Sequence, residues 1–215
     1  MSKASDRAYA RLRDEIREGL LPPGMQLREE QLAIACGTSR TPVRDALRRL
    51  ESECFVRRSA SKRTFVADWS LDEIDEAFLL RGMLEGYAAE RAARLIDDAG
   101  LEELRAANHG IASAADGSVL DVIAFLDHNR AFHRAIMTAA NSTRLVGLLG
   151  MIVEQPIVAR TVRQYDRAQI FQSHAEHEEL ILAFSRRDTE WARAVMMAHI
   201  RRAFHAYHHA YHEAS

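Results

Sequence analysis

Three histidines and one asparagine in the second half of the chain lie within apolar stretches, where their side chains could bind a metal ion. Asn129 and His133 are four residues apart, so a helix would present both on one face. His177 and His199 lie in two later apolar stretches. Three imidazoles and one amide oxygen could converge in the core of a helical bundle, which is where bundles hold metal ions. The spacing alone leaves the ordinary alternative open, in which each histidine is a hydrogen-bonded core or surface residue.

Basic residues gather between residues 40 and 63, where an excess of positive charge could bind DNA phosphates. Eight Lys and Arg face three Asp and Glu in this segment. Residues 1–68 carry 14 Lys and Arg against 10 Asp and Glu, so +4, whereas the rest of the chain carries 15 against 21, so −6. On charge alone, a solvated charged face is the alternative to a nucleic-acid surface.

The elements around the basic segment are those of a winged helix-turn-helix. The pattern predicts a helix over 8–18, an extended piece at 25–27, a short helix over 29–36, a turn at Gly37 and a helix from about Thr41. A hairpin of 56–58 and 64–66 follows. The helix from Thr41 buries an apolar stripe and leaves Arg40, Arg44 and Arg48 near its other side, while Lys62 and Arg63 lie at the hairpin tip. Arginines at the start of such a helix can form paired hydrogen bonds to guanine in the major groove.

From Ser70 onward the pattern contains helices only, separated by brief breaks. About six helices of a bundle are expected there. The predicted fold is therefore mainly α, with a winged helix-turn-helix domain over 1–68 and an all-α domain over 69–215.

Composition excludes some classes of protein. No apolar run approaches the roughly 18 residues that span a bilayer, and the first residues lack the apolar stretch of a signal peptide, so we expect a cytoplasmic protein with no membrane partner. Cys36 and Cys54 lack a metal-binding spacing. A metalloenzyme that uses a three-histidine site is an alternative function. The His-Glu-x-x-His motif is absent, however, because Ile181 stands four residues after His177.

The N-terminal motifs resemble those of the GntR family of regulators. The resemblance rests on a Leu-Pro-Pro-Gly turn at 21–24, Gln-Leu-Ala at 31–33 and Ser-Arg-Thr-Pro-Val-Arg at 39–44. It implies a homodimer that binds a palindromic double-stranded DNA operator, with contacts from Ser39, Arg40, Thr41, Arg44 and the wing tip. The chain departs from the family pattern where Cys54 and Arg63 replace glycines.

The helical part resembles the FadR-like branch of that family, in which a six- or seven-helix ligand-sensing FCD domain follows the winged helix. The matching strings are Phe-His-Arg-Ala at 132–135, Glu-His-Glu-Glu-Leu-Ile at 176–181 and Met-Ala-His-Ile at 197–200. The resemblance implies that His133, His177 and His199 bind a divalent metal such as Zn, Ni or Mn. Asn129 stands at the position of the family aspartate, and a neutral amide is a weaker ligand than a carboxylate.

The same resemblance implies that Arg81 faces an effector cavity, where a guanidinium would pair with a small organic acid. A surface ion pair with Glu85, four residues later, is the alternative. We therefore expect an effector-controlled DNA-binding regulator, a repressor rather than an enzyme. A dimeric DNA-binding protein without an effector is a further alternative.

Overall fold

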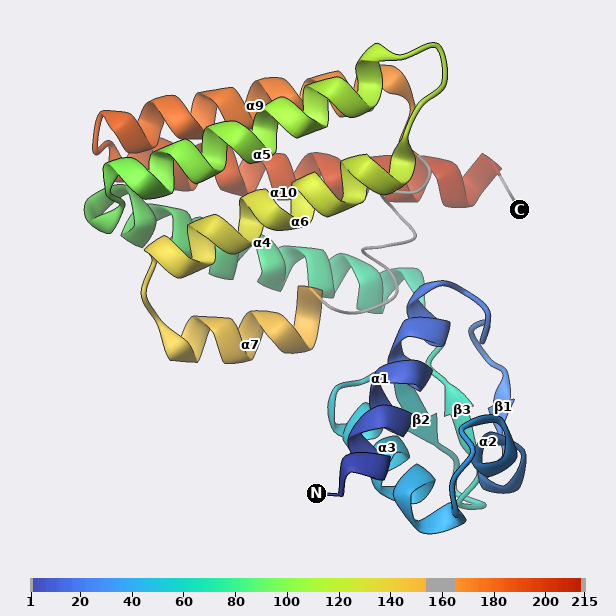
Figure 1. The fold of residues 1–215 in the computed structure, drawn as a ribbon. Coiled ribbons are helices and arrows are strands. Elements are labelled where there is room, and N and C mark those ends of the chain that lie inside the picture. Colours follow the sequence, from blue (N-terminus) through green and yellow to red (C-terminus); the bar gives the residue numbers. More distant parts are fainter. Residues whose placement is uncertain (1, 154–164, 214–215) are drawn as a thin grey trace. The chain divides into compact units, whose positions relative to one another are not determined.

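The computed structural model describes residues 2–153 and 165–213 (Figure 1). The described residues form two compact units that divide after Ser70, two residues beyond the predicted boundary. The first unit contains α1 (Lys3–Arg17), β1 (Gln26–Leu27), α2 (Glu29–Ala35), α3 (Arg40–Ser52), β2 (Val56–Arg58) and β3 (Thr64–Val66). The second contains α4 (Leu71–Leu95), α5 (Asp98–Asp116), α6 (Val122–Ala139), α7 (Thr143–Val153), α9 (Arg167–Ser185) and α10 (Thr189–Glu213).

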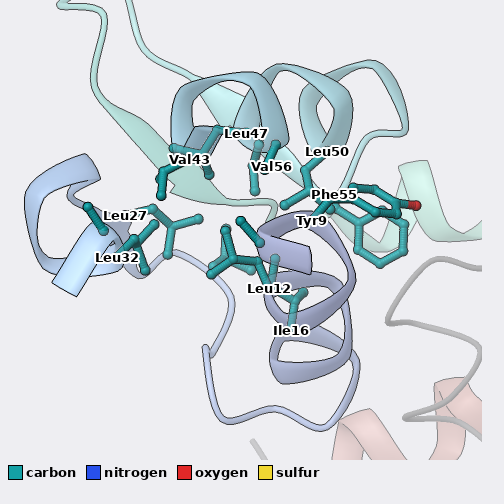
Figure 2. Close-up of a cluster of buried hydrophobic side chains, with 14 residues drawn as sticks. Tyr9, Leu12, Ile16, Leu27, Leu32, Val43, Leu47, Leu50, Phe55 and Val56 are labelled. Carbon is teal, nitrogen blue, oxygen red and sulfur yellow. The ribbon is translucent and has the colours of Figure 1, made fainter. Parts of the chain in front are cut away.

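One apolar cluster holds the first unit together (Figure 2). Leu12 and Ile16 of α1 pack with Leu47 and Leu50 of α3, and the side chain of Leu27 in β1 joins the same cluster. These side chains recur every three or four residues along α1 and α3, so each helix buries one face and leaves the opposite face in water. The exposed face of α3 is therefore fixed by the burial of its apolar stripe.

Three short antiparallel strands complete the first unit in the order β1-β3-β2. Val56 pairs with Val66 and Arg58 with Thr64, so β2 and β3 form the predicted hairpin, while β1 pairs with the outer side of β3. The unit is a winged helix-turn-helix, as the sequence predicts.

Two tight turns fix the ends of α2 and α3. Gly37 has φ +60° directly after α2, and Cys54 has φ +60° after α3. Glycine adopts this left-handed conformation without a steric penalty, whereas Cys54 bears one of roughly 1–2 kcal/mol. The turn after α3 thus keeps the geometry that a glycine would give.

The second unit is built of helices throughout its described residues, as predicted. α10 packs along α4, and α5 packs against both α6 and α9 (Figure 1). Aspartates 97, 121 and 166 cap α5, α6 and α9 with their side chains. None of the described helices is both long and apolar enough to cross a membrane.

Candidate DNA interface and metal centre

The first turns of α3 present the side chains predicted to contact DNA. Ser39 is the N-cap of α3, and its hydroxyl makes no capping hydrogen bond there. Because Val43, Ala46 and Leu47 are buried on the other side of the helix, the predicted residues face water. The exposed set is Ser39, Arg40, Thr41, Arg44 and Arg48. The backbone N–H groups at this helix start favour a phosphate at the same place.

One carboxylate of α2 holds two of these arginines. Arg44 donates from Nε to Glu29 Oε1 at 3.0 Å and from Nη2 to Glu29 Oε2 at 2.8 Å. Arg40 Nη2 lies 3.3 Å from the same Oε2. The hydrogen bonds from Arg44 are the main cause that lowers the pKa of Glu29, so the carboxylate is ionised at neutral pH. Arg44 therefore shows paired donor geometry already in the free protein, and DNA must compete with Glu29 for it.

The wing places Lys62 and Arg63 in water. Both side chains are exposed, between β2 and β3. Lys62 N donates to Ser59 O at 2.8 Å, and Ser59 N donates to Arg63 O at 2.8 Å. The residue with positive φ in this turn is Lys62, at +59°, rather than Arg63. Arg63 at the family glycine position therefore needs no left-handed backbone here.

Three buried histidines from three helices converge in the second unit. His133 lies on α6, His177 on α9 and His199 on α10. One ring nitrogen from each lies within 4.8 Å of the others. The Nε2 atoms of His133 and His199 are 3.3 Å apart. Two imidazole nitrogens bound to one tetrahedral zinc, at roughly 2.0–2.1 Å each, would lie about 3.3 Å apart.

Two of the three rings are each oriented by a carboxylate of their own. His133 Nδ1 donates to Glu85 Oε2 at 2.6 Å, and His199 Nδ1 donates to Glu176 Oε2 at 2.7 Å. Burial raises the pKa of both carboxyls, but neighbouring groups outweigh burial, so both pKa values lie below the usual value. For Glu85 the pKa is lowered by Arg81 and His133, and for Glu176 it is lowered mainly by His199. An ionised carboxylate can only accept, so each Nδ1 carries the proton, and Nε2 is the nitrogen that each ring turns toward the other histidine. This carboxylate–histidine arrangement is how proteins orient metal ligands.

His177 has the least satisfied ring of the three. It is fully buried, and neither ring nitrogen has a hydrogen-bond partner among the described residues. Its ring stacks on Phe132 with centroids 3.8 Å apart and planes 5° apart. Burial, together with the rings of His199 and His133, holds the pKa of His177 well below its usual value, so the ring is neutral. A buried polar atom without a partner is costly, and a bound cation would remove that cost. The three rings therefore fit a divalent metal.

Arg81 lies beside this cluster. It is buried and forms an ion pair with Glu85 through Nε. The sequence offered a surface ion pair with Glu85 as the alternative for Arg81. The pair exists, but Arg81 is 5% exposed and Glu85 is 4% exposed, so the pair lies in the interior. Glu85 connects the guanidinium of Arg81 to the ring of His133.

The remaining predicted ligand, Asn129, is half-buried on α6, one turn before His133. Two nearby histidines belong to other contacts. His174 Nδ1 lies 3.2 Å from Asn108 O, and His128 covers Gly110, where an added Cβ would lie 2.3 Å from its ring. His177, and not His174, is thus the residue of α9 that joins the cluster.

Both units match known family models. The model described as the FCD domain matches residues 76–202, and the model for bacterial regulatory proteins of the gntR family matches residues 4–66. The chain belongs to the GntR family and carries an FCD domain.

Relatives of this GntR-family protein are regulators. It is 33% identical over 132 residues to the probable D-xylose utilization operon transcriptional repressor of Paenarthrobacter nicotinovorans, a match that covers 61% of this chain and 57% of that protein. It is 25% identical over 182 residues to the Nta operon transcriptional regulator of Aminobacter aminovorans, covering 85% and 84%. A match to a regulator of Agrobacterium vitis, 38% identical over 88 residues, covers 41% of this chain and 52% of that one. The chain thus spans little more than half the length of two of these three relatives.

Solved structures share the fold along nearly the whole chain. The Escherichia coli protein McbR/YncC has a TM-score of 0.80 at 22% identity, covering 98% of this chain and 100% of that one. A GntR regulator of Rhodococcus has a TM-score of 0.75 at 20% identity, covering 97% and 99%. The family and the named relatives are regulators, which confirms the prediction that the chain is not an enzyme.

Three carboxylates beside the candidate sites were not predicted as site residues. Glu29 belongs to α2, yet it binds arginines of α3 that lie 11 and 15 residues further along the chain. Glu85 was considered only as a surface partner of Arg81. Glu176 is adjacent to His177 in sequence but binds His199 instead. Only the helix spacing of Arg81 and Glu85 gave a signal, because the other two contacts depend on how helices pack.

Proposed function

We propose that this GntR-family protein is a cytoplasmic transcription repressor that binds a palindromic operator as a homodimer and releases it in response to a small carboxylate. The observation that carries the sensing role is His177, whose two buried ring nitrogens lack partners beside two oriented histidines. A bundle that served only to dimerise would gain nothing from such a group.

The DNA contacts would come from one exposed surface of the winged helix. Arg40 and Arg44 would read base edges from the start of α3, and Ser39 and Thr41 would donate to phosphate. Arg48, Lys62 and Arg63 would add contacts to the backbone, which attract any duplex.

In the bundle, His133, His177 and His199 would hold a divalent metal such as Zn, Ni or Mn, with Asn129 as a neutral fourth ligand. When bound, the metal would supply a positive charge that attracts an anion. Two ion pairs lie beside the site, Arg81 with Glu85 and Arg202 with Glu176, and within each pair the two charges cancel. A dication among neutral imidazoles would therefore leave an excess of positive charge that favours a carboxylate.

Arg81 would position that carboxylate. Its Nε donates to Glu85, which leaves its Nη groups as the donors for a ligand. Since Glu85 also binds His133, a ligand on Arg81 would act on the same hydrogen-bonded chain that orients a metal-binding ring. A change there that shifts the population of DNA-competent dimers would couple the two units.

The test uses an operator selected by the full-length protein from random double-stranded DNA. Anisotropy titrations would compare that operator with a scrambled duplex, after chelation, after adding Zn²⁺, and with acetate, succinate or citrate. We expect preference for the selected operator, and a carboxylate-dependent loss of affinity only with metal present. Equal affinity for both duplexes would overturn the operator role. Operator preference that no metal or carboxylate changes, with no thermal shift, would favour a DNA-binding protein without an effector.

A further inference from the structure

Ser173 of α9 is a buried polar residue next to the histidine cluster. It is 4% exposed and lies one turn before His177, on the same buried face of the helix. Ser113 and Ser185 each donate to a carbonyl oxygen of their own helix, whereas the hydroxyl of Ser173 makes no hydrogen bond with any described residue. A hydroxyl buried without a partner costs free energy, and a ligand that hydrogen-bonds to it would remove that cost.

Ser173 lies between two places where side chains of α6 and α9 meet. Phe125 of α6 and Ile170 of α9 belong to one apolar cluster. Seven residues further along each helix, Phe132 stacks on His177 with ring centroids 3.8 Å apart. The two helices therefore run in the same direction with matched positions (Figure 1), and Ser173 falls between the two contacts.

Two other polar side chains lie around the same place. Asn129 lies between the same two contacts on α6, and Tyr165, just before α9, stacks on Phe125 with ring centroids 5.8 Å apart. Neither polar side chain makes a hydrogen bond with a described residue. Burial raises the pKa of Tyr165 to about 12, and the charges of Arg81 and Glu176 also act on this pKa. The phenol is therefore protonated at neutral pH and lies near the residue proposed to bind the carboxylate.

The charges around Ser173 favour a neutral group of a ligand. Ser173, Tyr165 and Asn129 carry no charge, and the nearby carboxylate of Glu176 is ionised. A second carboxylate buried among these side chains would therefore have no cation of its own. A hydroxyl group can both donate and accept a hydrogen bond, so it matches two protein hydroxyls that can each do the same.

We propose that Ser173, assisted by Tyr165, binds a hydroxyl group of the effector, so that the effector is a hydroxy acid rather than a simple carboxylate. The metal and Arg81 would hold the carboxylate, and Ser173 would select for the hydroxyl. Ser173 is thus a specificity-determining residue. The inference rests on the proposed function, because it concerns the ligand of the same site.

Pairs of acids that differ by one hydroxyl group test the inference. The full-length protein with Zn²⁺ added would be titrated by calorimetry with lactate and propionate, and with malate and succinate. We expect the hydroxy acid of each pair to bind at least about tenfold more tightly, because its analogue leaves the buried hydroxyl of Ser173 unpaired.

The four titrations separate this inference from the proposed function. Equal affinities within both pairs overturn the hydroxy-acid class and leave the sensing function standing. Succinate that binds as tightly as malate, and more tightly than lactate, overturns the hydroxy-acid class in favour of a diacid. If none of the four acids binds or shifts the melting temperature, the sensing function fails and this inference fails with it.

Ser173→Ala separates recognition of the hydroxyl from folding. The variant should bind lactate and malate no more tightly than propionate and succinate, and its affinity for the last two should be unchanged. Damage to the fold or to the metal site would weaken both members of a pair alike, so the ratio of affinities within a pair reports the hydroxyl contact. A ratio in Ser173→Ala equal to that of the wild type overturns the role of Ser173.

Two further variants complete the test. Ser113→Ala on α5 removes an exposed hydroxyl that bonds to its own helix, so it should keep the wild-type ratio. Tyr165→Phe removes the second hydroxyl, and its ratio should fall by less than that of Ser173→Ala. An unchanged ratio in Tyr165→Phe overturns the part assigned to Tyr165, and a lowered ratio in Ser113→Ala overturns the specific role of Ser173.

Discussion

The recognition helix α3 and the histidine cluster of the bundle both place carboxylates next to their functional side chains, but in opposite surroundings. Glu29 binds Arg40 and Arg44 in water, where the arginine side chains are 61% and 44% exposed. Glu85 and Glu176 bind His133 and His199 in the interior. An exposed ion pair contributes little and yields to a competing phosphate, whereas buried carboxylates fix the orientation of their partners. The first arrangement suits an exchangeable contact, and the second suits a preformed site.

The largest effect is expected at His177, where replacement should abolish the response to metal and preserve the stability of the metal-free protein. We expect His177→Leu to eliminate the rise in melting temperature on adding Zn²⁺, because a ligand is lost. The metal-free protein should keep its melting temperature or gain stability, because the variant removes two buried nitrogens that lack partners. Burying such a group without a partner destabilises the wild type by roughly 1–3 kcal/mol. Calorimetry before and after chelation measures both.

The control for that variant is His174→Leu, one turn earlier on α9. His174 contacts Asn108 O rather than the cluster, so the metal response should persist. A metal response in His177→Leu equal to that of the wild type would show that the buried site is not a metal centre.

The exposed site should respond to loss of a side chain through DNA affinity and not through stability. Arg44→Ala and Arg40→Ala should each weaken binding to the selected operator about tenfold or more, if each reads a base. Binding to a scrambled duplex should weaken much less. Anisotropy on both duplexes, with melting curves to confirm folding, distinguishes base reading from a phosphate contact, which would weaken both equally.

Asn129→Asp tests whether residue 129 is a ligand of the metal in the buried histidine cluster. A carboxylate attracts a dication more strongly than an amide, and the metal would neutralise the buried charge. We therefore expect tighter Zn²⁺ binding, by about tenfold, and a lower melting temperature in the metal-free state. Competition with a chelating dye measures the affinity. An unchanged affinity would place residue 129 outside the ligand set.

The smallest expected effect is at Glu29. Glu29→Gln frees Arg40 and Arg44 from their anionic partner, so binding to random DNA should rise a few-fold and its salt dependence should steepen by up to about one unit. The control is Glu30→Gln, which removes the same charge from the exposed neighbouring residue. Among the described residues Glu30 makes no bond to Arg40 or Arg44, so this variant should change the salt dependence of DNA binding less. Weaker operator binding in Glu29→Gln would instead mean that Glu29 positions the arginines for base reading.

The sequence by itself determined the order of elements and the residue types of both sites. Periodic apolar residues predicted α1, α3 and the bundle helices, because burying one face of a helix repeats every three or four residues. The same pattern predicted that Arg40, Arg44 and Arg48 are exposed. Motif resemblance, rather than spacing, singled out His133, His177 and His199 from the chain's ten histidines.

Only the tertiary structure decided which residues meet. His133, His177 and His199 come from three different helices, and their approach depends on helix packing that no local pattern encodes. Packing likewise placed the Arg81–Glu85 pair in the interior, although the same spacing also forms ion pairs on helix surfaces. It also joined Glu176 to His199 rather than to its sequence neighbour, and Glu29 to Arg44 across the turn. Carboxylate partners of this kind are invisible in sequence because their choice depends on distances of a few ångströms between elements, which only the assembled core sets.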